Sequence, residues 1–255
     1  MIKEGGDNGG QVTIFIVVGL VIVLSMILFF VIFATDIVVK NPPSKVPRNF
    51  VEQCIAGSVS PSLKAVLDYG GSIQPATYIM KNDHMYHYLC YAEEYYTRCY
   101  NYYPMLNAHA EEQILTDSFS RVDECFDFLV EDYESRGFDV ESEALDYKVQ
   151  IVPGSIRLKI RKPIAATKGD VSENFEEFDT SIPSDLYDLI SFTRSIINQE
   201  AEFCYFENNG FMMMYPKYNL TRFDLVETKI YDLQNRQTKE TFKFAIRSCA
   251  YAPGF

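Results

Sequence analysis

We predict an α+β fold for this chain: a single N-terminal hydrophobic helix, then a disulfide-tied mixed domain of about three helices and antiparallel hairpins. Three observations lead to this prediction. Residues 12–34 form an apolar run that is interrupted only by Thr13, Gly19 and Ser25. The chain beyond this run alternates between segments with helical apolar spacing and segments with strand-like spacing. Six cysteines follow the run, and none of them lies in a CxxC pair.

The composition indicates a globular and acidic protein. Apolar residues make up 47% of the 255 residues, which is ample for a buried core. The chain has 18 tyrosines, 19 phenylalanines and no tryptophan, a balance that favours a mixed or β-rich domain. There are 35 Asp and Glu residues against 23 Lys and Arg residues, which gives a net charge of −12. Such a surface repels phosphate backbones, so nucleic acid is excluded as a partner class.

The N-terminal apolar run is long enough to cross a membrane. It contains no charged residue, and a helix of ~23 residues is roughly 35 Å long against a hydrocarbon core of about 30 Å. The hydroxyls of Thr13 and Ser25 can bond to carbonyls of the preceding turn. A helix that is apolar on every side is buried in lipid or in other protein. We therefore expect a polar leader at residues 1–10, a transmembrane or filament-core helix at residues 11–35, and a proline-rich linker at residues 36–48.

An α+β domain is predicted over residues 49–255. Helical spacing of the apolar residues predicts helices at residues 49–69, 107–136 and 185–206. Pro61 is expected to break the first of these helices, because proline removes a backbone donor and clashes with the preceding turn.

Period-2 alternation and turn residues predict strands between and after the helices. A tyrosine-rich hairpin is expected at residues 76–103, with its turn at residues 92–94. The order of elements divides the domain into two lobes, residues 49–137 and residues 138–255. The other predicted strands are residues 145–152, 156–162, 171–182, 211–215, 223–232 and 241–248.

The even number of cysteines behind a hydrophobic segment predicts three disulfides on the oxidising side of a membrane. Six reduced core cysteines in a cytosolic domain are the alternative. Six cysteines allow about 15 pairings, and the sequence does not determine the pairing. The predicted elements favour one bond between the first two helices, one across the tyrosine-rich hairpin and one from the third helix to the last strand: Cys54–Cys125, Cys90–Cys99 and Cys204–Cys249.

The orientation of the chain depends on two opposing signals. Lys40, Lys45 and Arg48 lie just after the apolar run, and basic residues near a membrane helix favour the cytoplasmic side. The cysteines favour the other side, and a long domain is translocated largely regardless of nearby charge. We give the cysteines more weight and expect an extracytoplasmic domain. Asn219, in an Asn-Leu-Thr tripeptide, is then a candidate glycosylation site.

Tyrosines are concentrated in residues 78–103. A half-buried sheet face is the simpler interpretation of this pattern, and an adhesive surface or ligand platform is the alternative. The candidates for such an interaction surface are Tyr86, Tyr88, Tyr91, Tyr95, Tyr96, Tyr100, Tyr102 and Tyr103.

The sequence shows no catalytic motif. It contains neither a GxSxG elbow nor a Walker loop nor a dinucleotide glycine pattern. His84, His87 and Cys90 form the only spacing that hints at a metal, but residues three apart in a strand point to opposite faces. Adjacent glutamates such as those at 93–94 are typical of solvated surfaces. We therefore expect no enzyme activity, no metal and no cofactor.

The segment from Gly10 to Gly19, GQVTIFIVVG, resembles the start of membrane-anchored surface proteins of small-genome (DPANN-type) archaea. It is in turn similar to the archaeal type IV pilin (class III) signal, in which a peptidase cuts just before the Gln. The resemblance implies a processing site between Gly10 and Gln11 and a mature helix that packs into a filament core. Two positions differ from the pilin pattern: Gly9 stands in place of a basic residue, and Phe15 in place of an acidic one.

A looser likeness to uncharacterised proteins of that group extends along the chain. It rests on residues 50–55, the Gly70-Gly71 pair, Cys125 and residues 242–247. The motif of any specificity is confined to the first ten or so residues of the segment that begins at Gly10.

The resemblance and the residues together lead to one expected function. We expect a non-enzymatic archaeal cell-surface structural protein, either a pilin-like filament subunit or an adhesin, that assembles through its N-terminal hydrophobic helix. It would be a single-pass protein of the cell membrane with its C-terminal domain outside, or part of an extracellular filament. Its partners would be membrane lipid or copies of itself through residues 11–34, and a host or neighbouring cell surface. The alternative is a single-pass protein whose domain binds a ligand or belongs to a membrane complex.

Overall fold

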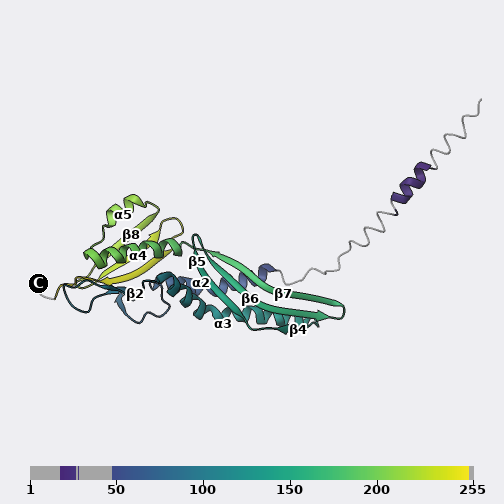
Figure 1. The fold of residues 1–255 in the computed structure, drawn as a ribbon, viewed down its shortest axis with the longest axis horizontal. Coiled ribbons are helices and arrows are strands. Elements are labelled where there is room, and N and C mark those ends of the chain that lie inside the picture. The colour runs from purple at the N-terminus through teal and green to yellow at the C-terminus, as the bar shows by residue number, and fades with distance from the viewer. Residues whose placement is uncertain (1–17, 27, 29–47, 253–255) are drawn as a thin grey trace, which may run out of the picture. The chain divides into compact units, whose positions relative to one another are not determined.

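The computed structural model describes residues 18–26, 28 and 48–252 (Figure 1). It divides the chain into two compact units, residues 1–45 and residues 46–255.

The described part of the first unit is a short helix. Residues 18–26 are helical, and their large apolar side chains are exposed. The Ser25 hydroxyl donates to the carbonyl of Ile22 at 2.8 Å, within the preceding turn. Among the described residues, no helix is both long enough and apolar enough to cross a membrane.

Several sequence-based predictions lie outside the described residues. These are the polar leader at residues 1–10, the processing site at Gly10 and Gln11, most of the helix at residues 11–35, and the linker up to residue 47. They stay predictions.

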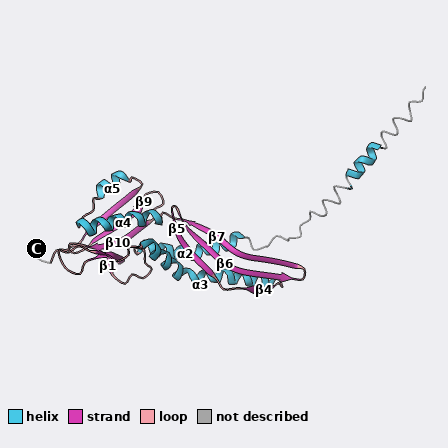
Figure 2. Cartoon of the chain, viewed as in Figure 1, coloured by secondary structure: helices cyan, strands magenta, loops and turns pink. Residues whose placement is uncertain are grey.

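The described part of the second unit has mixed α and β structure, which confirms the α+β class (Figure 2). Its helices are α2 (Arg48–Asp68), α3 (Leu106–Ser135), α4 (Leu186–Phe203) and α5 (Asn208–Met214). Its strands are β1 (Tyr78–Lys81), β2 (His84–Tyr91), β3 (Tyr100–Asn101), β4 (Asp139–Ser142), β5 (Asp146–Val152), β6 (Ser155–Lys168), β7 (Val171–Pro183), β8 (Tyr218–Asp224), β9 (Lys229–Asn235) and β10 (Thr241–Arg247).

The strands form two sheets. Sheet A has the order β1-β2-β10-β9-β8, with β3 also paired to β2. Its β2 and β10 strands are parallel, and its other pairs are antiparallel. In sheet B, β6 is the central strand, with β7 on one edge and β4 and β5 on the other.

Sheet B confirms the strands predicted from alternation. In β5 and β6 the apolar residues alternate with charged ones, and Val149 is paired with Leu158 on the buried face. Pro153 and Gly154 connect the two strands as predicted, since Gly154 adopts a φ of +77°. The buried face packs on α3, and the other face carries charged side chains.

Helices α2 and α3 pack side by side and are joined by the Cys54–Cys125 disulfide (Figure 1). The prediction that Pro61 breaks the first helix is wrong, because α2 continues through it. Pro61 removes one hydrogen bond from the helix. Val59 and Leu63, on either side of it, are buried in the core and keep this turn helical.

The tyrosine-rich hairpin has its turn at a different place from the prediction. Asn82 and Asp83 connect β1 to β2 with φ values of +50° and +59°. Asn and Asp are the residues that tolerate this left-handed conformation, so the turn signal was in the sequence. The expected turn at residues 92–94 belongs instead to a longer loop, after which β3 pairs with the end of β2.

The region after α4 also differs from the prediction. Residues 211–215 were expected to be a strand, but most of them belong to α5, whose first turn is capped by the Glu207 side chain. Phe and Met are compatible with either structure, and this cap favours the helix. The expected strand at residues 223–232 is divided by a turn between β8 and β9.

The expected lobes, residues 49–137 and residues 138–255, are not separate structural units. β2 comes from the first range and pairs with β10 from the second. Residues of both ranges share one core, and residues 46–255 form a single compact unit. The division into lobes was predicted from the order of elements along the chain, and it fails because strands far apart in the sequence pair in one sheet.

The end of α2 allows a sharp test of this packing. Gly70 has a φ of +62°, and a Cβ added there would lie 2.9 Å from the carbonyl oxygen of Lys243 in β10. We expect Gly70→Ala to lower the free energy of unfolding by about 2 kcal/mol or more, from left-handed strain plus the clash. Urea unfolding of the full chain measures it. Gly154→Ala is the matched control, because Gly154 also has positive φ but has no atom near its Cβ position. If both variants lose the same free energy of unfolding, the close contact between Gly70 and the Lys243 carbonyl is contradicted.

Candidate functional site

The structure separates the eight candidate tyrosines into two groups. Tyr86 and Tyr88 are buried in β2, and Tyr91 and Tyr103 are half-buried. The remaining four are exposed, and a fifth exposed tyrosine near the C-terminus joins them. We call this group the tyrosine face: Tyr95, Tyr96, Tyr100, Tyr102 and Tyr251, which are 37–77% exposed.

The buried tyrosines serve the fold. The Tyr88 hydroxyl shares a hydrogen bond of 2.8 Å with the Thr228 hydroxyl. Burial, together with the nearby Asp232 carboxylate, raises the pKa of Tyr86 to about 12. For these side chains the sheet-face interpretation holds, whereas the exposed tyrosines of the tyrosine face are not explained by it.

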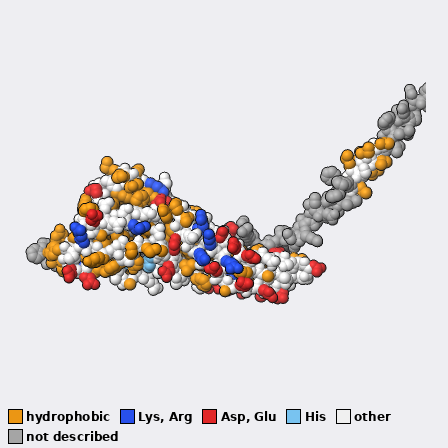
Figure 3. Space-filling model, in the orientation of Figure 1, with side chains coloured by type: hydrophobic (Ala, Val, Ile, Leu, Met, Phe, Trp, Pro, Cys, Tyr) orange, Lys and Arg blue, Asp and Glu red, His pale blue; other side chains and the backbone are white. Residues whose placement is uncertain are grey.

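The tyrosine face lies at one end of sheet A. Figure 3 shows hydrophobic side chains, tyrosine included, gathered at the end of the second unit near the C-terminus. The rings of Tyr96 and Tyr251 meet edge to face, with their centroids 5.7 Å apart. The rings of Tyr91 and Tyr102 lie 6.4 Å apart. Residues from two separate parts of the chain, the segment 91–102 and Tyr251, therefore meet at this end of the sheet.

The loop at residues 92–99 continues sheet A beyond its strands. The Cys90–Cys99 disulfide closes it. Tyr96 has a φ of +61°, a conformation that is costly for an aromatic residue and that the surrounding bonds maintain. Three backbone hydrogen bonds of 2.7–2.9 Å join the loop to β10 and the chain after it: Ala92 N to Arg247 O, Cys249 N to Thr97 O, and Tyr96 N to Ala250 O.

Arg247 supports the loop from below. Its side chain is nearly buried, and the guanidinium carbon lies 5.4 Å from the Tyr91 ring centroid and 5.0 Å from that of Tyr95. The guanidinium donates to the carbonyls of residues 92–93 and pairs with the Glu227 carboxylate at 3.3 Å. Tyr95 donates its hydroxyl to the same carboxylate at 2.9 Å. A buried arginine with every partner in place makes the loop rigid.

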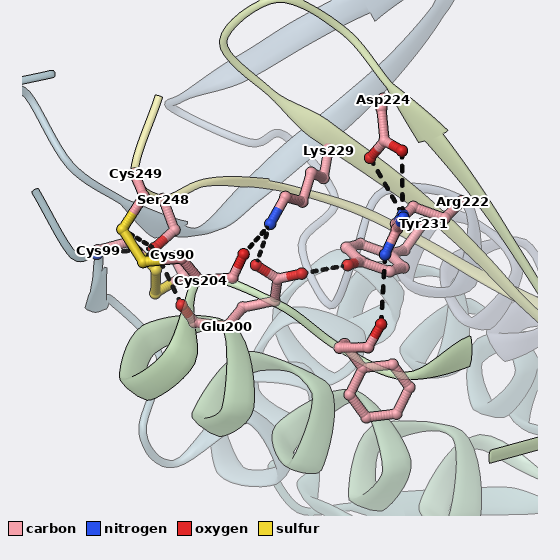
Figure 4. Close-up of polar contacts among 11 residues, drawn as sticks. Cys90, Cys99, Glu200, Cys204, Arg222, Asp224, Lys229, Tyr231, Ser248 and Cys249 are labelled. Carbon is pink, nitrogen blue, oxygen red and sulfur yellow. Dashed lines mark hydrogen bonds and ion pairs between the residues drawn. A yellow bond between two sulfur atoms is a disulfide. The ribbon is translucent and has the colours of Figure 1, made fainter. Parts of the chain in front are cut away.

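Ser248 connects this loop to helix α4 (Figure 4). Its hydroxyl accepts from the Cys99 backbone N–H at 3.2 Å and donates to the carbonyl of Glu200 at 2.9 Å. The Cys204–Cys249 disulfide joins the C-cap residue of α4 to the chain just after Ser248. The three disulfides are thus the pairs that the predicted elements favour.

A buried carboxylate lies next to this junction. Glu200 is fully buried and accepts from Lys229 Nζ at 2.6 Å and from the Tyr231 hydroxyl at 2.5 Å (Figure 4). Lys229 also donates to the carbonyl of Cys204. Burial and the Glu200 charge raise the pKa of Tyr231 far above its usual range. Both carboxylate oxygens are engaged and shielded from solvent, which fits a structural ion pair rather than a catalytic acid or base.

Two cavities open at this end of sheet A. One has a volume of about 310 Å³ and lies over the Cys204–Cys249 disulfide, between Arg222, Lys229 and Tyr251. The other has a volume of about 410 Å³, and its walls are formed by the loop and the adjoining ends of β2 and β3: Tyr91, Ala92, Glu93, Glu94, Thr97, Tyr100 and Tyr102. Both volumes are in the range of small-ligand sites.

The histidines do not converge on a metal site in the described residues. His84 bonds to the carbonyl of Asp68 at 2.9 Å, whereas His87 is buried on the other side of β2. The described part of the chain contains no group of three or more His, Cys, Asp or Glu residues that could hold a metal ion.

Instead, His87 and His109 meet around Ser72, a contact that the sequence did not predict. The Ser72 hydroxyl lies 3.2 Å from His87 Nδ1 and 2.9 Å from His109 Nε2. The Tyr103 hydroxyl lies 3.1 Å from His87 Nε2. A serine beside an imidazole resembles a nucleophile and its base. Ser72 is 3% exposed, however, and its hydroxyl is engaged by both rings, so a substrate carbonyl has no access to it.

Asn219 lies on β8, the edge strand of sheet A, and is half-buried. Its side-chain oxygen accepts from Arg236 at 3.2 Å. Its glycosylation stays a prediction.

No protein-family model, curated protein or solved structure matches this chain. The resemblance to archaeal surface proteins therefore stays an expectation, and the function is argued from the side chains.

Sequence reasoning missed the residues that organise this site. Arg247 and Ser248 come 155 and 149 residues after their partners in the loop, and Glu227 comes 132 residues after Tyr95. Arg247 ends an apolar strand, and no local sequence pattern indicates that its side chain contacts tyrosine rings so far away in the sequence. Glu93 and Glu94 were expected to be solvated, and both are exposed, but they also form part of a cavity wall.

The histidine cluster predicts acid sensitivity. Burial lowers the pKa of His87 to about 4, and that of His109 is lowered in the same way. The unfolded chain binds a proton at His87 near pH 6.5, so the folded state loses stability as the pH falls from about 6.5 to about 4. We expect His87 to contribute a loss of about 3 kcal/mol over this window. Urea unfolding at a series of pH values measures it, with His87→Gln as the control. An unchanged pH dependence in His87→Gln would contradict the prediction.

The two hydrogen bonds of the Ser248 hydroxyl should stabilise the fold, and removing this hydroxyl should lower stability although the side chain hardly changes in volume. Ser248→Ala leaves the Cys99 N–H without its acceptor in a buried position and should lower the free energy of unfolding by about 1–3 kcal/mol. Ser195→Ala on the exposed face of α4 is the control, for which we expect a change within about 0.5 kcal/mol. Thermal and urea unfolding compare them. Similar small changes in both variants would show that the junction is dispensable.

Proposed function

We propose that this protein is a non-enzymatic cell-surface protein that binds a partner through the tyrosine face. In this proposal residues 11–35 anchor the chain in a membrane or a filament core, and the second unit carries the binding surface outside the cell. The observation that carries the proposal is the set of exposed tyrosines on the disulfide-closed loop, on β3 and the residue after it, and near the C-terminus.

The chemistry of tyrosine supports a role in binding. A tyrosine ring offers a large apolar area and a hydroxyl, and fixing it costs little side-chain entropy. Tyrosine is therefore enriched among the residues that dominate binding energies. The tyrosine face contributes little to the core, because its side chains are 37–77% exposed. Exposed apolar surface gathered in one place is typical of an interaction site.

The framework beneath the tyrosine face also supports the proposal. Two disulfides, Cys90–Cys99 and Cys204–Cys249, bracket the loop and the chain after β10. Nearly buried Arg247 donates to the Glu93 carbonyl of the loop, and the Ser248 hydroxyl accepts from the Cys99 N–H, so both bonds join the two segments. A loop fixed in this way loses little conformational entropy when a partner binds. Three disulfides in one chain are also consistent with an extracellular location.

The second candidate function is binding of a small ligand by a single-pass membrane protein. The cavity of about 410 Å³ beside the tyrosine face favours it. The two candidates share one surface, and they differ in whether the partner is a macromolecule or a free small molecule.

An adhesion assay tests the proposal. Beads coated with the full-length protein are added to intact cells of the producing organism and of its neighbours. The variant Tyr96→Ser/Tyr100→Ser/Tyr251→Ser should reduce adhesion about a hundredfold or more, since it removes three exposed aromatic anchors that each contribute on the order of 1 kcal/mol. Tyr78→Ser/Phe119→Ser/Phe128→Ser is the matched control, because it also removes three exposed aromatic rings, all of them outside the tyrosine face. Equal adhesion of both variants and the unchanged protein would refute the proposal.

Electron microscopy of native surface material separates the filament form from the single-pass form. Polymers of this chain would support assembly through residues 11–35. Isolated particles would remove the filament form and leave the adhesin.

A further inference from the structure

The geometry points to a cation site in the cavity beside the tyrosine face: the cavity of about 410 Å³ binds the ammonium group of a lysine side chain on a protein partner. This inference rests on the proposed function, because it names the chemistry that the same surface recognises. We call the cavity the ammonium pocket. It is formed by residues 91–94 and 97 and by the rings of Tyr100 and Tyr102.

Three tyrosine rings surround the ammonium pocket. The centroids of Tyr91 and Tyr102 are 6.4 Å apart, and their planes are inclined by 33°. Tyr100 is 77% exposed and stands at the mouth. The face of an aromatic ring carries negative potential and attracts a cation within about 6 Å of its centroid. The Arg247 guanidinium already lies 5.4 Å from the Tyr91 ring centroid, so the rings left for a group placed in this cavity are those of Tyr100 and Tyr102.

Two carboxylates give the ammonium pocket its charge. Glu93 and Glu94 both line it and both are exposed. In the described part of the chain, neither side chain makes an ion pair within 4.0 Å. The nearest buried cation, Arg247, lies next to the Tyr91 ring, and its guanidinium pairs with Glu227 and donates to the carbonyls of residues 92–93 rather than to the Glu93 or Glu94 carboxylate. Arg98 belongs to the same loop but is not part of the cavity wall. The pocket thus offers negative charge that the fold does not use.

The lining selects among ligand classes. Two carboxylates exclude phosphate and other anions. A quaternary ammonium ion would use the rings but has no N–H to donate to the carboxylates or to the Thr97 hydroxyl. A primary ammonium group has three donors and a full charge, so it uses both the rings and the oxygen atoms. A lysine side chain also has a long apolar stem, which can lie along the tyrosine rings.

The net charge of the chain agrees with a basic partner. At −12 the protein attracts positively charged surfaces over long range and speeds their association. The ammonium pocket would then provide the contact that orients the partner. Salt should weaken the attraction, since charges are screened beyond about 8 Å at physiological ionic strength.

The experiment uses the full chain in detergent and the probe Nα-acetyl-lysine N-methylamide. Backbone amide signals of the loop are followed by NMR during the titration. We expect shifts confined to the loop at residues 92–99 and its neighbours, with a dissociation constant on the order of 1–10 mM. The probe whose side-chain amine is acetylated keeps the same apolar stem but lacks the charge, and it should cause no such shifts. Tetramethylammonium should bind more weakly than the amine.

Two charge variants locate the site. Glu93→Gln/Glu94→Gln should weaken binding of the amine probe about tenfold, because both carboxylates are lost from the pocket. Glu176→Gln/Glu177→Gln is the matched control: it removes the same charge from exposed positions on β7 and should leave binding unchanged. All four positions are exposed, so neither variant disturbs the core.

Three results would overturn the inference: equal shifts with the acetylated probe, equal binding by both charge variants, or shifts with a neutral sugar but none with the amine. Each is distinct from failure of the proposed function. If the tyrosine variants abolish adhesion while the amine probe gives no shifts, the tyrosine face stands and the ammonium pocket is refuted. If the probe binds at the pocket while adhesion is unaffected by the tyrosine variants, the cation site stands and the proposed function is refuted.

Discussion

The parallel pairing of β2 with β10 is the constraint on which the rest of the second unit depends. It places His87 beside Phe244 and Cys90 beside Ile246, in the centre of sheet A. Every later contact of the site follows from that register, because the loop after β2 and the chain after β10 leave the sheet at the same end. Their backbones continue to bond beyond the last strand residues. A shift of this register would separate the tyrosine face into unrelated pieces.

Stability and recognition use different side chains at this end of the molecule. The buried side chains bond within the fold and hold the backbone: Glu200 pairs with Lys229, Ser248 donates to the Glu200 carbonyl, and Arg247 donates to the carbonyls of the loop. The exposed tyrosines and glutamates project from that backbone and add little to the core. Such a division lets the surface residues change without loss of the fold, which is how a binding surface adapts to a new partner. The same division makes the proposed variants at exposed positions informative, since the framework stays intact.

The sequence predicts well the structure that depends on near neighbours. Helix α3 and the β5–β6 turn have regular apolar patterns and clear turn residues, and both were located within a few residues, although β6 continues to Lys168, well past its predicted end at residue 162. The Asn82-Asp83 turn was missed although its signal is local, whereas the short segment at 211–215 is ambiguous between helix and strand. The β2–β10 pair could not be predicted, because no local pattern relates strands about 150 residues apart. The site depends on that pair, so its tyrosines were identified but their exposure and supports were not.

The connectivity of the disulfides has a consequence for how the chain is made. Numbered in order of synthesis, the cysteines pair as first with fourth, second with third, and fifth with sixth. A chain oxidised as each cysteine emerges would join Cys54 to Cys90, the first partner that becomes available, and this bond is not native. Cys54 must therefore stay reduced until Cys125 arrives, or a wrong bond must be exchanged later by thiol attack. Production of this protein in an oxidising compartment should accordingly depend on a disulfide isomerase, while the last bond, between consecutive cysteines, should form without one.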